Sequence, residues 1–117
     1  ALDYYPSSGR YIHEIASYYA SHENYDKAMQ VIRLFDPFIE KHRGPHNPRG
    51  IFVYKIRDLE ADIRFHDGDK AKAINIARQN LQDAKQNVYV ITSSKSRNFV
   101  ARDQLLEYLQ KKVCLFD

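Results

Sequence analysis

The sequence has no tryptophan and a single cysteine, Cys114, among its 117 residues. One cysteine excludes an internal disulfide and a cysteine-based zinc site, and it suits a reducing compartment. The sequence shows neither a signal peptide nor an apolar run long enough to span a membrane. We therefore expect a cytoplasmic protein. Because the chain begins with Ala1 instead of methionine, we also expect it to be a fragment of a larger protein.

Glycine and proline are scarce, with four of each, and three of the prolines and two of the glycines fall between Pro37 and Gly50. Outside that segment, glycine and proline, which interrupt regular structure, are rare, and this favours long helices over many short strands. The apolar share of 44% is enough for a packed core and argues against disorder. The sequence therefore predicts one all-α domain that spans residues 1–117.

Apolar residues recur at helical spacing in five stretches. The first two are joined by the polar turn at residues 21–24, so they form an antiparallel helical hairpin. The expected elements are a first hairpin at about 10–42, a loop at 43–50, a second hairpin at about 51–92 and a terminal helix at about 98–114. Pro37 either kinks the second helix or restarts it with Asp36 as cap. Val88–Thr92 favours a strand by propensity, but its helical neighbours lead us to expect a continued helix.

The first hairpin resembles a tetratricopeptide repeat. Ala28 falls nine residues after an aromatic position and takes the place of the small residue at the helix crossing, with Tyr25 before it and Ile32 after it. Phe35 stands where the family prefers a small residue, and Pro37 comes earlier than the family's closing proline. The preceding helix supplies the pattern of large, apolar, small and aromatic residues with Ile12, Ile15, Ala16 and Tyr19.

The second hairpin matches this pattern less closely. Gly68 and Asp69 resemble the family's turn, and Ala73 and Ala77 fit its second helix. Ala28 and Ala73 are 45 residues apart, whereas the common repeat has a period of about 34 residues. The loop at 43–50 and a longer second helix account for the excess. The resemblance covers about residues 10–87 and implies an array of about five stacked helices.

The resemblance also implies a function: a scaffold that binds a protein or peptide in a concave groove, as the ligand-sensing or interaction part of a larger regulator. In such an array the first helix of each hairpin lines the groove. Arg10 and Arg57 are then expected to hold an acidic side chain by bidentate hydrogen bonds, and Tyr54 to supply a flat apolar surface. The groove candidates are Arg10, His13, Glu14, Ser17, Tyr54, Arg57, Asp58 and Arg64.

Two other functions are open from the sequence. The net charge of +3 and the basic clusters near residues 41–49 and 95–102 permit a helical nucleic-acid-binding domain. Such a domain would interleave its basic residues with exposed aromatics, whereas most aromatics here lie at core spacing, so nucleic acid is not the expected partner. Tyrosines beside the apolar stripes, among them Tyr108, either pack on a neighbouring repeat or line a groove. The third function is a structural segment that forms homo-oligomers.

Catalytic and metal chemistry find little support in the sequence. A catalytic set needs a nucleophile, a base and an orienting group, yet the carboxylates are scattered over polar helix faces. Cys114 stands beside Leu115 and Phe116, so it is expected to be a buried apolar contact. His42 and His46 are four residues apart, but Gly44 and Pro45 between them prevent helical zinc-site geometry. We expect no enzymatic activity, no metal and no cofactor.

Overall fold

The computed structural model describes residues 8–42, 50–86 and 102–117, and these ranges contain five α-helices. These helices are α1 (Gly9–Ser21), α2 (Tyr25–Phe35), α3 (Ile51–His66), α4 (Lys70–Lys85) and α5 (Arg102–Phe116). A 3-10 helix, η2 (Asp36–His42), continues α2. The predicted all-α fold with five helices is confirmed. None of the helices in these ranges is both long enough and apolar enough to cross a bilayer.

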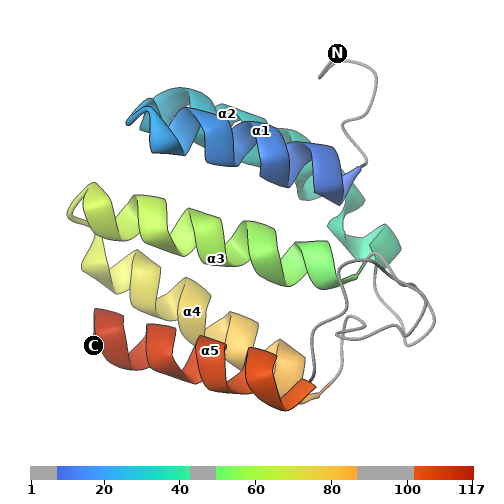
Figure 1. Ribbon diagram of the computed structural model, residues 1–117, viewed down its shortest axis with the longest axis vertical. Coiled ribbons are helices and arrows are strands. Elements are labelled where there is room, and N and C mark those ends of the chain that lie inside the picture. The colour runs from blue at the N-terminus through green and yellow to red at the C-terminus, as the bar shows by residue number, and fades with distance from the viewer. Residues whose placement is uncertain (1–7, 43–49, 87–101) are drawn as a thin grey trace.

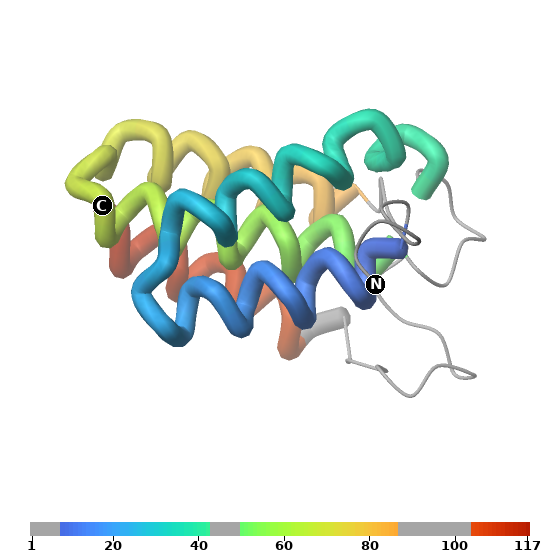
Figure 2. The backbone as a smooth tube through the Cα atoms, turned by 90° about the horizontal axis from the view of Figure 1, so that it is seen from above, coloured from blue at the N-terminus to red at the C-terminus, as the bar shows by residue number. Residues whose placement is uncertain are grey.

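The helices form two layers. The α1, α3 and α5 helices run parallel to one another in one layer, and α2 and α4 run the opposite way in the other layer (Figures 1 and 2). The α1 helix packs on α2 and α3 on α4, so each pair is an antiparallel hairpin. The two hairpins contact each other mainly through α1 and α3 and to a smaller extent through α2 and α3, and α5 packs against α4. Among the described residues no sixth α-helix pairs with α5 to make a third hairpin.

The turns inside the hairpins follow from local sequence chemistry. The side chain of Asn24 caps α2 by accepting a hydrogen bond from the backbone N–H of Lys27, and Asp69 caps α4 in the same way through Lys72. Gly68 has a φ of +87°, which a residue with a side chain adopts only at a cost. The structure thus ends α3 and starts α4 where the sequence predicts a turn.

The core is built from the predicted apolar stripes, and its closest approaches are made by small residues. Ala28 has an exposed fraction of 0%, and Ala73 on α4 is equally inaccessible. Gly9, at the start of α1, lies directly against Phe52 of α3. The main cluster includes Ile12, Ala16, Ala28, Ile32, Phe35, Phe52, Ile56, Ile63, Leu81, Ala84, Leu105 and Leu109.

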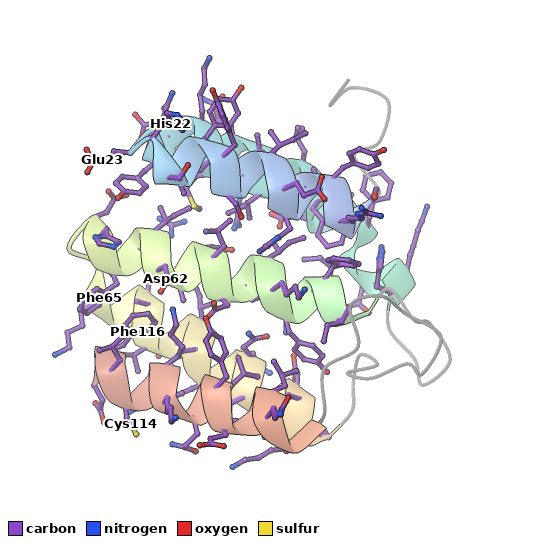
Figure 3. All side chains as sticks on the ribbon, viewed as in Figure 1. His22, Glu23, Asp62, Phe65, Cys114 and Phe116 are labelled. Carbon is purple, nitrogen blue, oxygen red and sulfur yellow. The ribbon has the colours of Figure 1, made fainter. Side chains whose placement is uncertain are left out.

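The structure corrects the prediction for Cys114, which is exposed at the outer edge of α5 (Figure 3). Phe116 takes the buried place instead and stacks on Phe65 of α3, with ring centroids 4.8 Å apart. Two residues along a helix correspond to a rotation of roughly 200°, so burial of Phe116 turns Cys114 outward. His42 is also buried, and its ring packs edge-on against Phe35. The predictions for His46 and Val88–Thr92 concern positions outside the described residues.

Candidate functional site

The layer of parallel helices carries a groove between α1 and α3. Side chains three or four residues apart lie on one face of a helix. On the two walls of the groove, His13, Ser17 and Ser21 of α1 face Lys55, Leu59 and Asp62 of α3. Two hollows, each with a volume of about 410 Å³, lie end to end along these rows. We call them the first hollow, near the start of α3, and the second hollow, near its end.

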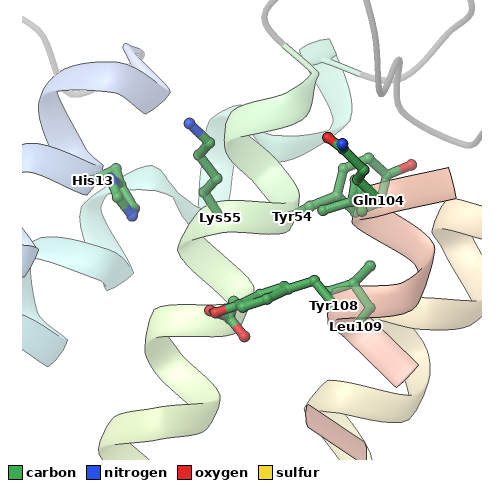
Figure 4. A pocket seen from close by; sticks show the side chains of 8 residues that line it. His13, Tyr54, Lys55, Gln104, Tyr108 and Leu109 are labelled. Atoms are coloured by element: carbon green, nitrogen blue, oxygen red, sulfur yellow. The ribbon is translucent and has the colours of Figure 1, made fainter. Parts of the chain in front are cut away.

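The first hollow is bounded by three helices (Figure 4). His13 of α1 and Lys55 of α3 form one side, and α5 forms the other with an apolar surface and one amide. The Lys55 ammonium lies 5.4 Å from the centroid of the Phe52 ring. The complete lining of the first hollow is His13, Tyr54, Lys55, Asp58, Gln104, Leu105, Tyr108 and Leu109.

Lys55 and His13 are the basic side chains that line this hollow. Burial lowers the pKa of the His13 imidazole below its usual 6.5, the neighbouring Lys55 lowers it further, and Glu14 opposes them in part. The imidazole is therefore neutral at pH 7, with one ring nitrogen that donates a hydrogen bond and one that accepts. Within residues 8–42, 50–86 and 102–117 the structure shows no salt bridge to either side chain, and the Lys55 ammonium contacts the Phe52 ring.

The second hollow has a more acidic and hydroxylated lining. Ser17 and Ser21 lie on one wall, and Asp62 and His66 on the other. The His66 ring stacks on Tyr25, with the ring centroids 5.8 Å apart and the planes at 9°. Ala20, Leu59 and Ile63 complete the lining. This end of the groove therefore offers hydrogen-bond acceptors next to an apolar floor.

A polar cluster joins α3 to α5 beside the groove. Tyr108 donates a hydrogen bond of 2.6 Å to Oδ2 of Asp58, and the Lys112 ammonium lies 3.7 Å from Oδ1 of the same carboxylate. Lys112 also donates a 2.5 Å hydrogen bond to Oδ1 of Asp62. We call these four residues, Asp58, Asp62, Tyr108 and Lys112, the α3–α5 cluster.

The protonation states of the α3–α5 cluster follow from burial and from these bonds. Burial raises the pKa of the Asp58 carboxyl, although Tyr108 and Lys112 counteract it. Burial, the bond to Asp58 and its negative charge raise the pKa of Tyr108 to about 12. Burial acts to lower the pKa of Lys112, but Asp62 and Asp58 outweigh it and the net shift is upward. At neutral pH, Tyr108 is thus neutral and Lys112 charged.

Of the eight groove residues predicted from the sequence, four line the hollows: His13, Tyr54 and Asp58 the first, and Ser17 the second. Tyr54 borders the first hollow, but its exposed fraction is only 1% and its hydroxyl donates a hydrogen bond to the backbone carbonyl of Asp83. Tyr54 therefore offers a ligand little of the flat apolar surface expected for it, because almost all of its surface is buried and its hydroxyl is bound to α4.

The predicted arginine grip is not assembled. Arg57 points to α4, where it donates a 2.6 Å hydrogen bond to Oδ2 of Asp83, and not into the groove. Arg64 pairs with Glu60, which also binds Arg33 of α2. The neighbours of α3 explain this result: it is contacted by α1, α2 and α4, so its polar residues divide among several faces. Arg10 and Glu14 pair with each other on the exposed surface of α1 at 3.3 Å.

The sequence reasoning missed Lys55, Asp62 and Lys112. Lys55, Asp62 and His66 follow one another at intervals of seven and four residues, a spacing that places all three on the same face of a helix. The row was visible in the sequence, but the apolar pattern alone did not show that it lines a groove. For Tyr108, the position beside the apolar stripe of α5 was a usable signal, and the structure places its ring at the first hollow with 45% of its surface exposed.

The basic clusters named in the sequence analysis lie mostly outside the described residues. The described residues contain no group of three or more histidine, cysteine, aspartate and glutamate side chains placed to hold a metal ion. No protein-family model, no curated protein and no solved structure matches this chain. The resemblance to tetratricopeptide repeats is thus one of residue pattern.

Proposed function

We propose that this chain is a peptide-binding helical-repeat scaffold of the tetratricopeptide type, and that the groove of α1 and α3 holds an extended segment of a partner protein. The observation that carries the proposal is the pair of hollows that lie end to end along two parallel helices, with Lys55 and His13 facing one of them. Clefts with an apolar surface and a few converging polar groups are the usual form of a binding site.

The length of the groove suits a short peptide. Lys55 and His66 are eleven residues apart on α3, which corresponds to about 16 Å along the helix axis. An extended chain covers that length with about five residues. A segment of this size contacts both hollows at once, whereas a single amino acid or a metabolite of similar volume would occupy only one.

The lining indicates the composition of the peptide. The Lys55 ammonium favours a carboxylate, and the His13 imidazole can share its hydrogen bonding. Leu105 and the exposed ring of Tyr108 offer apolar contact next to these polar groups. A peptide with acidic and apolar side chains fits both, which keeps the sequence-based expectation for the ligand but moves the basic contact from Arg10 and Arg57 to Lys55.

Selection from a displayed library of random peptides tests the proposal. Selected peptides are synthesised, and their dissociation constants are measured for the unmodified chain, for Lys55→Gln and for Lys27→Gln. Lys27 is the matched control because its ammonium also lies over an aromatic ring, 5.6 Å from the centroid of Tyr19, but on α2 outside both hollows. Loss of a charge-assisted bond worth about 1 kcal/mol weakens binding about fivefold.

We expect that weakening for Lys55→Gln and no change for Lys27→Gln. Backbone amide signals from His13, Ser17, Lys55 and Asp62 should shift when a selected peptide is added. The proposal is wrong if the library yields no binder, or if the selected peptides bind both variants equally and shift signals elsewhere.

A further inference from the structure

We propose that the groove recognises two opposite charges at a fixed spacing: a carboxylate of the ligand at Lys55 and His13, and a cationic side chain three residues away at Asp62. This inference rests on the proposed function and adds the charge pattern of the peptide. It is carried by the placement of Lys55 and Asp62 on one groove wall and by the charge balance of the α3–α5 cluster.

The charge balance leaves the cluster one unit negative. Asp58 and Asp62 carry two negative charges, Lys112 supplies one positive charge, and Tyr108 is a neutral donor. Asp58 uses both of its carboxylate oxygens within the cluster, one with Tyr108 and one with Lys112. Asp62 binds Lys112 through Oδ1, and a carboxylate has further acceptor sites. The excess negative charge is therefore available at Asp62, which lines the second hollow.

The spacing follows from helix geometry. Lys55 and Asp62 are seven residues apart on α3, so their attachment points are about 10 Å apart along the axis. A ligand in the polyproline II conformation repeats every three residues with a rise of about 3.1 Å, which places side chains i and i+3 on the same side about 9 Å apart. A regular β-strand alternates its side chains, so its i and i+3 positions point to opposite sides. The groove thus fits an acidic and a basic residue at positions i and i+3.

Two end-capped peptides of identical composition test this inference. One contains Glu-Pro-Leu-Lys, which separates the charges by three residues, and the other contains Glu-Lys-Pro-Leu, which places them next to each other. Capped ends remove the terminal charges, and proline favours the polyproline II conformation. Binding is followed by the amide signals of the groove residues, because this method detects weak complexes.

We expect the peptide with separated charges to bind the unmodified chain about two- to fivefold more tightly, the effect of one partly exposed ion pair. The Asp62→Asn variant should lose this preference. Glu107→Gln is the matched control, since it removes one negative charge from the exposed surface of α5 and should keep the preference. Thermal melting of both variants verifies that they fold.

Each result decides the question. A preference for the separated charges that Asp62→Asn removes supports the inference. Equal binding of both peptides in the groove overturns it and leaves the proposed function standing. Failure of both peptides to shift the groove signals also overturns it, while the peptides selected from the library decide the proposed function separately. A preference that survives in Asp62→Asn, with the variant folded, overturns the assignment of the cation to Asp62.

Discussion

Tyr108 of α5 and Asp58 of α3 are fifty positions apart in the sequence and are joined by a 2.6 Å hydrogen bond. The bond ties the last helix to the centre of the molecule, at the edge of the first hollow. It also holds the proton of Tyr108, whose pKa is raised from 10.0 to about 12. The contact thus links the packing of α5 to the pH of the solution.

The first prediction concerns alkaline pH. Below pH 10 the phenol is protonated in both the folded and the unfolded chain, so its full contribution to stability is present there. Between pH 10 and about 12 the unfolded chain loses this proton and the folded chain keeps it, so stability falls as the pH rises. In Tyr108→Phe this part of the decline should be missing. Melting temperatures of both proteins across this range provide the measurement, and parallel curves would contradict the assignment.

The second prediction compares two adjacent lysines. Lys112 has only 17% of its side chain exposed and serves both Asp58 and Asp62, whereas Lys111 is 75% exposed and pairs only with Glu107. Lys112→Met leaves two carboxylates without their cation and should lower the free energy of unfolding by about 1–2 kcal/mol. Lys111→Met should change it by less than about 0.5 kcal/mol.

Because the pKa of Lys112 is raised above 10.5 in the folded chain, its contribution is fully present below pH 10.5 and is lost as the pH rises through the folded value. Urea unfolding at neutral and at alkaline pH should therefore show the Lys112→Met deficit shrinking as the solution becomes more basic. A deficit that is equal for the two lysines would remove the α3–α5 cluster as a source of stability.

The third prediction addresses the crossing of α1 and α2. Ala28 is completely inaccessible, so the larger side chain of Ala28→Leu has to displace its neighbours. We expect a loss of about 1–3 kcal/mol, seen as a fall of several degrees in the melting temperature. Ala71→Leu, on the exposed face of α4, adds the same atoms where there is room. If both variants melt like the unmodified chain, the close crossing at Ala28 does not exist.

The fourth prediction separates two costs of adding one methyl group to a glycine. A Cβ atom on Gly9 would lie 2.7 Å from the Cβ of Phe52, and the backbone there is helical, so Gly9→Ala is destabilised by the clash between α1 and α3. A Cβ on Gly68 meets nothing within 4 Å, but φ is +87°, so Gly68→Ala costs about 1–2 kcal/mol through the backbone. Gly68→Asn should cost less than Gly68→Ala, because asparagine tolerates this conformation better.

A matching variant at the other glycine distinguishes the two mechanisms. Gly9→Asn should be at least as harmful as Gly9→Ala, because asparagine is larger and the position needs space rather than a left-handed backbone. Guanidinium unfolding of the four variants gives the two orders directly. The same order at both positions would show that one of the two explanations is wrong.

Much of the fold is predictable from the sequence because local signals agree with one another. The apolar stripe with Ile12 and Ala16 recurs at helical spacing, Asn24 and Asp69 are good caps, and Gly68 suits a turn. A helix interior and its turns depend on nearby residues, so they can be read from short windows. The two-layer arrangement follows because amphipathic hairpins bury their apolar faces against each other.

The groove is less predictable because it depends on which face of α3 meets which neighbour. Arg57 and Lys55 are both polar and only two residues apart, yet they lie roughly 200° from each other around the helix. One reaches Asp83 of α4 and the other borders the first hollow. Hydrophobic periodicity identifies the buried stripe, but it gives no information on which of the remaining faces a partner helix covers.

The parallel course of α1 and α3 has a consequence for any charged ligand. Peptide dipoles add along a helix, so each N-terminal end carries a partial positive charge and each C-terminal end a partial negative one. Neither helix has an acidic residue in its first turn or a side-chain cap that would offset this field. Lys55 stands at the fifth residue of α3, so its positive charge and the backbone field act in the same direction, and the neutral His13 imidazole takes the corresponding place on α1. A peptide with separated charges should consequently enter in a single orientation, and added salt should weaken that selectivity before it weakens the apolar contacts.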